Sequence, residues 1–433
     1  MEKVNFVDKV RQLIPNEESN IPQFRLDAYN FLKDNSLPTL KNESWKYINL
    51  SFLNKYDFKF DQQFSDSIDC DCNKYAINGL DSYHIYVLNG KIDFNKSDMP
   101  QELEVEEIDN QRAFDSLDEH RQTYFTKLND AFYKNCISLK VSKNIVIDKP
   151  IHIIYISDAN TNDCLINTRR IFRFENNTEV TIIESFVTIG DSKSFYNGTA
   201  DIFVGENSTI HHIKLQQDSN SDVIVDFIQA NQQKYSNYVN LTFTTAGNFV
   251  RNNLNSKLND ENIEAHFLGV FIADNNNLVD NRTLVDHLKP NCFSNENYRG
   301  ILFDRSTGIF NGKILVHPDA QKTNAYQSNK NILASNNATI NTKPELEIYA
   351  DDVKCSHGAT SGALDKNSLF YLRARGIDAI KAESLLMNAF VAEVIDELKN
   401  KQLKNYLHNI TRHKLNEDLK FIDNEDLINI DEL

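Results

Sequence analysis

The sequence has 433 residues, of which 40% are hydrophobic and 25% are charged, and its formal net charge is −16. A chain this long exceeds what one hydrophobic core usually holds, so two or three domains are expected. The acidity is spread along the chain, which argues against nucleic acid or an anionic membrane surface as a partner. No window approaches the ~18 apolar residues of a membrane span, and the charged N-terminus does not resemble a secretory signal. These features predict a cytoplasmic protein.

The first 135 residues are predicted to form a mostly helical region. Apolar residues recur at three- and four-residue spacing over residues 4–14, 24–31 and 112–133, which is the period of an amphipathic helix. A short strand is expected at residues 83–89.

From Cys136 onwards the pattern changes to alternating apolar and polar residues, and short strand-like runs recur every eight to twelve residues or so until about Ile348. Glycine and proline are scarce, with 13 and 8 copies, whereas there are about 55 asparagines. Tight hairpins would favour Asn-Gly or Asp-Gly turns, which are almost missing between these runs. A parallel β-solenoid over residues 136–365 is favoured because its turns accept asparagine in left-handed geometry and can stack polar side chains. An antiparallel sandwich is the alternative.

The alternation stops after Gly376, and residues 366–433 are predicted to be helical. Asp378 can cap a helix that runs to about Asn400. The tail from residue 401 reads as one or two further helices, ending in an acidic segment at residues 423–433. Helices at both ends of a solenoid could cover its open ends, where backbone groups would otherwise be unpaired.

Six cysteines in a chain of this length do not make a disulfide framework, and most are expected to pack as small apolar side chains. Cys70 and Cys72 are too close in sequence for the usual zinc spacing, so we interpret them as incidental thiols in an acidic loop. His211 and His212 lie in a strand-like run and should face opposite ways.

The segment from Asp351 to His357 holds the strongest candidates for chemistry. In a strand, Cys355 and His357 share one face, and a thiolate and an imidazole at that spacing can both reach a soft or borderline metal. Two ligands are too few for an iron–sulfur cluster, which usually takes four. The pair therefore either packs structurally or supplies part of a site that another chain completes.

A glycine-lysine segment at residues 308–314 superficially resembles a phosphate-binding loop. It has three residues between the glycines where four are needed, and Ile314 stands where a hydroxyl should follow the lysine. The chain is therefore expected to lack a nucleotide-binding loop of its own.

Several segments occur in the order known from one protein family. They are residues 343–360, 369–377 and 389–393, with supporting stretches at 298–301, 308–314, 325–333 and 43–47. This series resembles the SufB/SufD family of the Suf iron–sulfur cluster assembly system. The match is dense from about Arg299 to Glu393 and patchy before that. Many segments agree in order, which makes the resemblance specific.

Within this family the chain is similar to a SufD-type member. The block from Cys355 to Thr360 has the SufD form. Where SufB carries its cluster-building cysteine, residues 335–340 read Ser-Asn-Asn-Ala-Thr-Ile, and Ala338 offers no thiol. This departure implies that the chain is not the main sulfur acceptor and would share ligands with a SufB-like partner.

The resemblance implies a right-handed parallel β-helix core flanked by N- and C-terminal helical regions. It implies a non-catalytic scaffold that pairs with a SufB-like paralogue and binds the SufC-type ABC ATPase through about residues 378–398, with a homodimer possible in isolation. His357 would lie at the seam with the SufB-like chain and Cys355 would be a second contributor to a transient, shared iron–sulfur cluster. No cofactor would be tightly bound by this chain alone.

Two alternative functions are also considered for this chain. One is a β-helix enzyme acting on polysaccharide, although no converging set of acids can be assigned. The other is an interaction scaffold in which His357 is merely packed and has no metal role.

Overall fold

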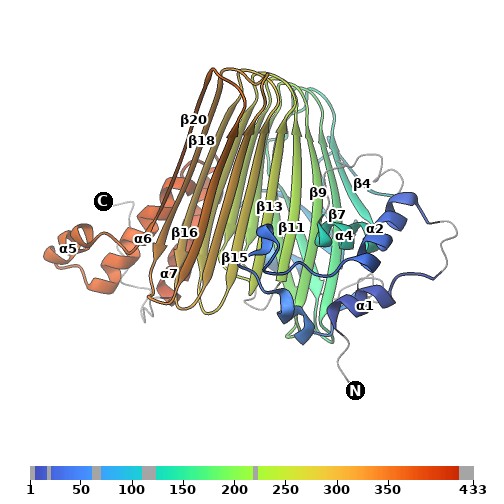
Figure 1. Cartoon of the computed structure of the whole chain (residues 1–433), viewed down its shortest axis with the longest axis horizontal. Coiled ribbons are helices and arrows are strands. Elements are labelled where there is room, and N and C mark those ends of the chain that lie inside the picture. Colours follow the sequence, from blue (N-terminus) through green and yellow to red (C-terminus); the bar gives the residue numbers. More distant parts are fainter. Residues whose placement is uncertain (1–4, 17–20, 61–69, 110–122, 218–222, 419–433) are drawn as a thin grey trace.

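The computed structural model describes residues 5–16, 21–60, 70–109, 123–217 and 223–418. Its centre is a parallel β-solenoid of about seven turns, with helices towards both termini (Figure 1). Each turn contributes one strand to each of two facing sheets. The predicted solenoid is confirmed, and the antiparallel sandwich is wrong, because successive turns pair strand on strand in parallel register.

The first sheet, called sheet A, contains nine strands along its main path, and a short strand, β1 (Lys59–Phe60), pairs beside β7. In spatial order they are β4 (Leu103–Ile108), β5 (Cys136–Val141), β7 (Cys164–Phe174), β9 (Ser194–Val204), β11 (Val223–Gln232), β13 (Phe249–Leu258), β15 (Leu278–His287), β17 (Thr307–Val316) and β19 (Thr339–Ile348).

The second sheet, called sheet B, faces the first. In spatial order its strands are β3 (Lys91–Ile92), β2 (Tyr83–Leu88), β6 (Ile151–Asp158), β8 (Glu179–Ile189), β10 (Thr209–Gln216), β12 (Asn237–Thr244), β14 (Glu264–Ala273), β16 (Phe293–Leu302), β18 (Thr323–Leu333) and β20 (Val353–Gly362).

Asparagine has the role in the turns that the composition predicts. Ten non-glycine residues in the described part of the chain have positive φ, and seven of them are asparagine. An asparagine side chain tolerates this left-handed geometry better than most others. The amides also stack from turn to turn: Asn177 Nδ2 donates to Asn144 Oδ1 at 2.7 Å, and Asn207 Nδ2 donates to Asn177 Oδ1 at 2.9 Å.

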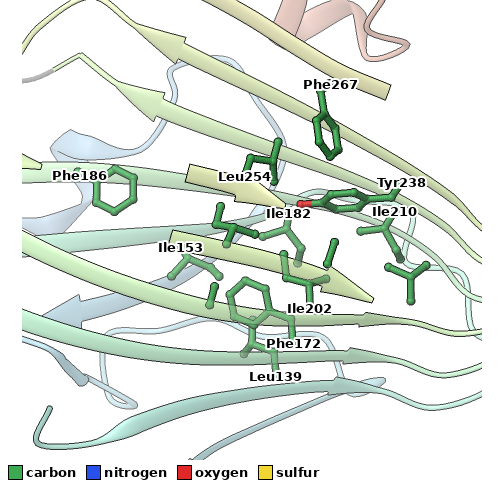
Figure 2. Packing of buried hydrophobic residues seen from close by; sticks show 14 of the residues in the cluster. Leu139, Ile153, Phe172, Ile182, Phe186, Ile202, Ile210, Tyr238, Leu254 and Phe267 are labelled. Atoms are coloured by element: carbon green, nitrogen blue, oxygen red, sulfur yellow. The ribbon is translucent and has the colours of Figure 1, made fainter. Parts of the chain in front are cut away.

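The interior of the solenoid is filled by the inward-facing residues of both sheets. Figure 2 shows aliphatic and aromatic side chains such as Phe172, Ile182 and Tyr238 converging between the strands. Because successive side chains of a strand point to opposite faces, every second residue of a strand lies in the core. Burial of these side chains stabilises the solenoid by roughly 25 cal/mol per Å² of apolar surface removed from water.

The N-terminal helices cover the outer face of sheet A. They are α1 (Phe6–Gln12), α2 (Gln23–Asp34) and α4 (Tyr124–Phe132), with short 3₁₀ helices η1 (Glu43–Trp45) and η2 (Leu50–Lys55). A third 3₁₀ helix, η4 (Cys72–Tyr75), packs instead against β2 and β6 of sheet B. Phe6 packs against Phe195 of β9 with ring centroids 6.3 Å apart. Trp45, from the aromatic segment at residues 43–47, lies under the Arg251 guanidinium at 3.8 Å, which fastens this region to β13.

The C-terminal helices are α5 (Lys366–Ala374), α6 (Ala379–Ile395) and α7 (Lys401–Asp418). The Asp378 side chain accepts a hydrogen bond from the Ile380 N–H at 2.9 Å, which confirms the predicted cap. Val391, Val394 and Leu407 pack with the outward apolar residues of sheet B. In Figure 1, α5 projects away from the solenoid.

The expectation that terminal helices cover the open ends of the solenoid is wrong, because both helical groups lie on the outer faces of the sheets. The N-terminal end is closed instead by β3 and β4, which pair antiparallel with β2 and β5. A reversed strand stops the parallel ladder there. The helices pack on the faces because they bury apolar residues that point outward from the middle strands.

Two helix predictions extend beyond the described residues. Of the predicted helix at residues 112–133, α4 accounts for Tyr124–Phe132, and residues 110–122 lie outside. Helix α7 ends at Asp418, so the acidic segment at residues 423–433 also lies outside. Within the described ranges, no helix combines the length and apolarity needed to cross a membrane.

Candidate functional site

The C-terminal end of the solenoid is an open edge. Strands β19 and β20 each pair with one neighbour, β17 and β18, and with no further strand in the described part of the chain. Nearly all of β20 is exposed, and its only charged residue is Lys354. By contrast, β19 carries Pro344 and charged residues including Glu345 and Glu347, features that discourage edge-to-edge pairing. Strand β20 is therefore the less protected of the two edges.

Both predicted ligands lie on β20. Cys355 is opposite Ala325 and His357 is opposite Gln327 in the register with β18, so the two occupy alternate positions on one face, as predicted. Cys355 is half-buried and packs against a small apolar cluster that includes Ile314 and Val316, and burial raises the pKa of its thiol. His357 is exposed. No group of three or more His, Cys, Asp or Glu side chains with metal-binding geometry occurs among the described residues.

A polar column that sequence reasoning missed lies beneath His357. The register places His357 above Gln327, and Gln327 above Glu296 of β16. Gln327 Nε2 donates to Glu296 Oε2 at 3.1 Å, and Thr283 Oγ1 of β15 donates to the same oxygen at 2.6 Å. Burial raises the pKa of the Glu296 carboxyl to about 7, although the two hydrogen bonds from uncharged donors act to lower it. His357, Gln327 and Glu296 are aligned only by the register of their strands.

A second polar cluster occupies the lumen nearer the N-terminus. Arg170 Nη1 donates to Glu184 at 2.6 Å, and its other nitrogen contacts Asp226. Lys214 Nζ lies 2.8 Å from Asp226, and His212 Nε2 lies 2.8 Å from Glu184. Burial disfavours the charged Glu184, but Arg170 and His212 outweigh it and lower the pKa of this carboxyl. These charges neutralise one another inside the molecule.

The two adjacent histidines behave as predicted. His212 is almost fully buried in this interior cluster. His211 is half-exposed on the opposite face of β10, and burial, followed by Lys399, lowers the pKa of its ring. The pair therefore cannot bind one metal ion together.

The C-terminal helices present an exposed aromatic surface next to a firmly held helix. Phe370 and Tyr371 of α5 are 74% and 56% exposed, and this exposure was not predicted. Helix α6 is held to β16 by an ion pair between Arg299 and Glu393, and Asn297 Nδ2 donates a 2.8 Å hydrogen bond to Glu397, just beyond the C-terminal end of the helix. Between α6 and α7 lies a groove of about 720 Å³ whose lining includes several basic side chains: Lys399, Lys401, Lys404, His408 and Arg412.

A solenoid with helices on its outer faces and one unfilled edge belongs to the class of parallel β-helix proteins. Comparison with known protein families identifies the family to which this chain belongs. The model of the core domain shared by SufB and SufD, described for iron–sulfur cluster assembly by the SUF system, matches residues 155–390, and the N-terminal region model of the same proteins matches residues 4–153.

Individual relatives agree. The iron–sulfur cluster assembly protein SufD of Escherichia coli is 30% identical over 374 residues, which cover 85% of this chain and 87% of that protein. A SufBD family protein of Synechocystis is 29% identical over 403 residues, 88% of each chain. The chloroplastic protein ABCI7 of Arabidopsis thaliana is 29% identical over 295 residues, 66% of this chain and 62% of that protein.

The chain therefore belongs to the SufBD family of iron–sulfur cluster assembly proteins, and the predicted SufD-type membership is confirmed. Its role lies in iron–sulfur cluster assembly.

Proposed function

We propose that this chain is the non-catalytic, cytoplasmic scaffold subunit of a Suf assembly complex. It pairs with a SufB-like paralogue and binds a SufC-type ABC ATPase, which supplies the ATPase activity. In this role it supports de novo assembly of iron–sulfur clusters and the acquisition of iron. The observation that carries the proposal is the exposed His357 on β20, whose outer edge pairs with no strand in the described part of the chain.

The open edge provides the surface for the SufB-like chain. Unpaired backbone groups on an edge strand are satisfied when another chain adds a strand or packs over them. His357 and Cys355 on the same face of β20 then supply ligands at the seam, and the partner supplies the remainder of the four that a cluster usually takes. Without that partner, the same edge would favour a homodimer of this chain.

The ATPase would dock on the C-terminal helices, chiefly residues 378–398, together with the exposed aromatic residues of α5. Much of α6, including Met387 and Val391, is buried against this chain's own sheet, so Phe370, Tyr371 and Ile380 offer the accessible apolar surface. ATP-driven movement of α6 would reach β16 through the Arg299–Glu393 ion pair, and from β16 the ladder continues to β18 and β20.

The metal role is tested with His357→Ala in a complex co-expressed with a SufB-like chain and a SufC-type ATPase. We expect iron and acid-labile sulfide in the anaerobically purified complex to fall by about tenfold or more, because one of the proposed ligands is lost at the seam. The control is His317→Ala, which removes a partly exposed histidine paired with Asp286. Wild-type iron and sulfide in the His357→Ala complex, with its subunits intact, would favour the interaction scaffold without a metal role.

The docking surface is tested with Phe370→Ser, measured by co-purification of the SufC-type ATPase. Loss of a large exposed aromatic from an interface typically costs about 2 kcal/mol or more, so binding should weaken at least ~30-fold. Phe94→Ser is the matched control, because Phe94 is 49% exposed in the N-terminal part of the chain. Equal ATPase recovery with both variants would place the docking site elsewhere. The family assignment leaves the polysaccharide-active enzyme without support.

A further inference from the structure

Cys70 and Cys72 are brought together by the fold. Their Sγ atoms are 3.0 Å apart, closer than the ~3.5–4 Å at which non-bonded heavy atoms usually meet. The Asp71 side chain accepts a hydrogen bond from the Asn73 N–H at 3.2 Å, which caps η4 and fixes the turn between the two cysteines. The side chains of the two cysteines therefore converge, which the interpretation of these thiols as incidental did not anticipate.

The two thiols have different environments. Cys70 is half-exposed, whereas Cys72 is 4% exposed and packs with Tyr86, Ile154 and Val187. Burial, and then the hydrogen bond with Cys70, raise the pKa of Cys72 to about 12. The thiol that reacts first with an external disulfide is therefore the outer one, Cys70, since a buried, protonated thiol is a poor nucleophile.

A lysine is placed beside the inner thiol. Lys96 Nζ lies 3.9 Å from Cys72 Sγ and 3.5 Å from the Cys70 carbonyl oxygen. Its positive charge lowers the pKa of Cys72, against the larger effect of burial. An ammonium group at this position can stabilise a thiolate that forms transiently on Cys72.

The geometry favours covalent chemistry between the sulfurs over metal binding. Two thiolates on a tetrahedral zinc ion lie ~3.8 Å apart, because each Zn–S bond is about 2.3 Å. The described residues also contain no third histidine, cysteine or carboxylate grouped with this pair in metal-binding geometry.

We propose that Cys70 and Cys72 form a modification site, a dithiol that is reversibly oxidised by low-molecular-weight disulfides such as oxidised glutathione. The Cys70 thiolate attacks one sulfur of the disulfide RSSR, forming a Cys70–SR mixed disulfide and releasing RS⁻. Cys72 then loses its proton to solvent, and its thiolate attacks Cys70 Sγ and releases the second RS⁻. The two protein thiols are oxidised to one disulfide, and RSSR is reduced to two RSH. Nothing in this step depends on the proposed assembly role.

The test incubates the full-length protein in glutathione buffers of graded redox ratio, quenches with acid, alkylates and identifies each cysteine by mass spectrometry. We expect a Cys70–Cys72 disulfide that forms and reverses with the buffer ratio. Cys355, which is half-buried, serves as the internal control: it should take only a mixed disulfide. The proposal is overturned if both Cys70 and Cys72 remain alkylated throughout, or if Cys70 in the wild type stops at the mixed disulfide.

Variants separate the two steps. Cys72→Ser should trap the mixed disulfide on Cys70, whereas Cys70→Ser should leave Cys72 largely unreacted because it is buried. Lys96→Gln should slow the second step several-fold, so that the mixed disulfide accumulates before the final disulfide forms. Unchanged kinetics in Lys96→Gln would refute the role given to the lysine. Thermal unfolding of each variant, compared with the wild type, shows that the loop still folds.

Discussion

The N-terminal and C-terminal halves of the solenoid differ in how their buried charges are paired and in whether their sheet edges are covered. Near the N-terminus, Arg170, Glu184, Lys214 and Asp226 neutralise one another in the lumen, and reversed strands close the sheet edges. Near the C-terminus, Glu296 is buried with uncharged partners, and β20 ends the ladder exposed. The first half is complete within one chain. The second half ends in an unpaired strand edge, where we propose that another chain packs.

The largest expected effect on stability comes from disrupting the buried charge cluster of the N-terminal half. Arg170→Met leaves two buried carboxylates that have lost a shared cation, because Arg170 contacts both Glu184 and Asp226. We expect the free energy of unfolding to fall by about 3–5 kcal/mol, the usual cost of removing one partner from a buried ion pair. Urea unfolding followed by circular dichroism measures this loss.

Arg305→Met is the matched control, because Arg305 is exposed on the turn after β16. Exposed substitutions of this kind usually change stability by less than ~0.5 kcal/mol. A loss in Arg170→Met no greater than that in the control would mean that the interior cluster does not hold the two sheets together.

The second prediction concerns the pH dependence of stability that arises from Glu296 in the C-terminal half. The pKa of Glu296 is about 7 in the folded protein, above the ~4.5 of an unfolded chain, so the folded state favours the protonated form. Wild-type stability should therefore decrease as the pH rises from ~4.5 through 7 and then level off. Glu296→Gln removes this loss, and its stability relative to wild type should rise by about 2–3 kcal/mol between pH 5 and pH 8.

Unfolding midpoints at both pH values measure the difference. Glu206→Gln, on an exposed turn, is the control and should show the same stability change between the two pH values as the wild type. Equal pH profiles for Glu296→Gln and the wild type would contradict the raised pKa of Glu296.

The third prediction tests the asparagine ladder on the turns. Asn177 has φ of 59° and exchanges amide hydrogen bonds with Asn144 and Asn207. Asn177→Ala loses both bonds and places an alanine in left-handed geometry, so the free energy of unfolding should fall by about 1–2 kcal/mol. Asn177→Gly, which keeps the backbone freedom, should cost less than the alanine variant. Chemical denaturation of both variants distinguishes the backbone from the side-chain contribution, and equal losses would exclude a backbone contribution.

The smallest expected effect lies at the same turn in the C-terminal half. Lys322 occupies a left-handed position, with φ of 58°, where the earlier turns have asparagine except for the one at Tyr235. Lys322→Asn should therefore raise the free energy of unfolding by about 0.5 kcal/mol. A loss of stability in this variant, measured by the same denaturation assay, would mean that the two halves do not share one turn rule.

The sequence by itself determined the class of fold and the shared strand face of the two candidate ligands. Alternation, scarce glycine and abundant asparagine are local properties, and they predicted a solenoid whose turns accept left-handed residues, as Asn177 and Asn207 confirm. The spacing of Cys355 and His357 placed both on one strand face, since strand geometry has a period of two residues.

Only the tertiary structure decided what lies next to what. The Thr283–Glu296–Gln327 contacts, the Arg170 cluster and the approach of Lys96 to Cys72 join residues that are tens of positions apart or on different elements. The helices cover the sheet faces instead of the solenoid ends because outward apolar residues, invisible before the register is known, bind them there. A one-residue shift in the register of a strand would move its side chains, Glu296 on β16 for example, to the opposite face. Which residues of separate turns lie opposite one another is decided by long-range pairing.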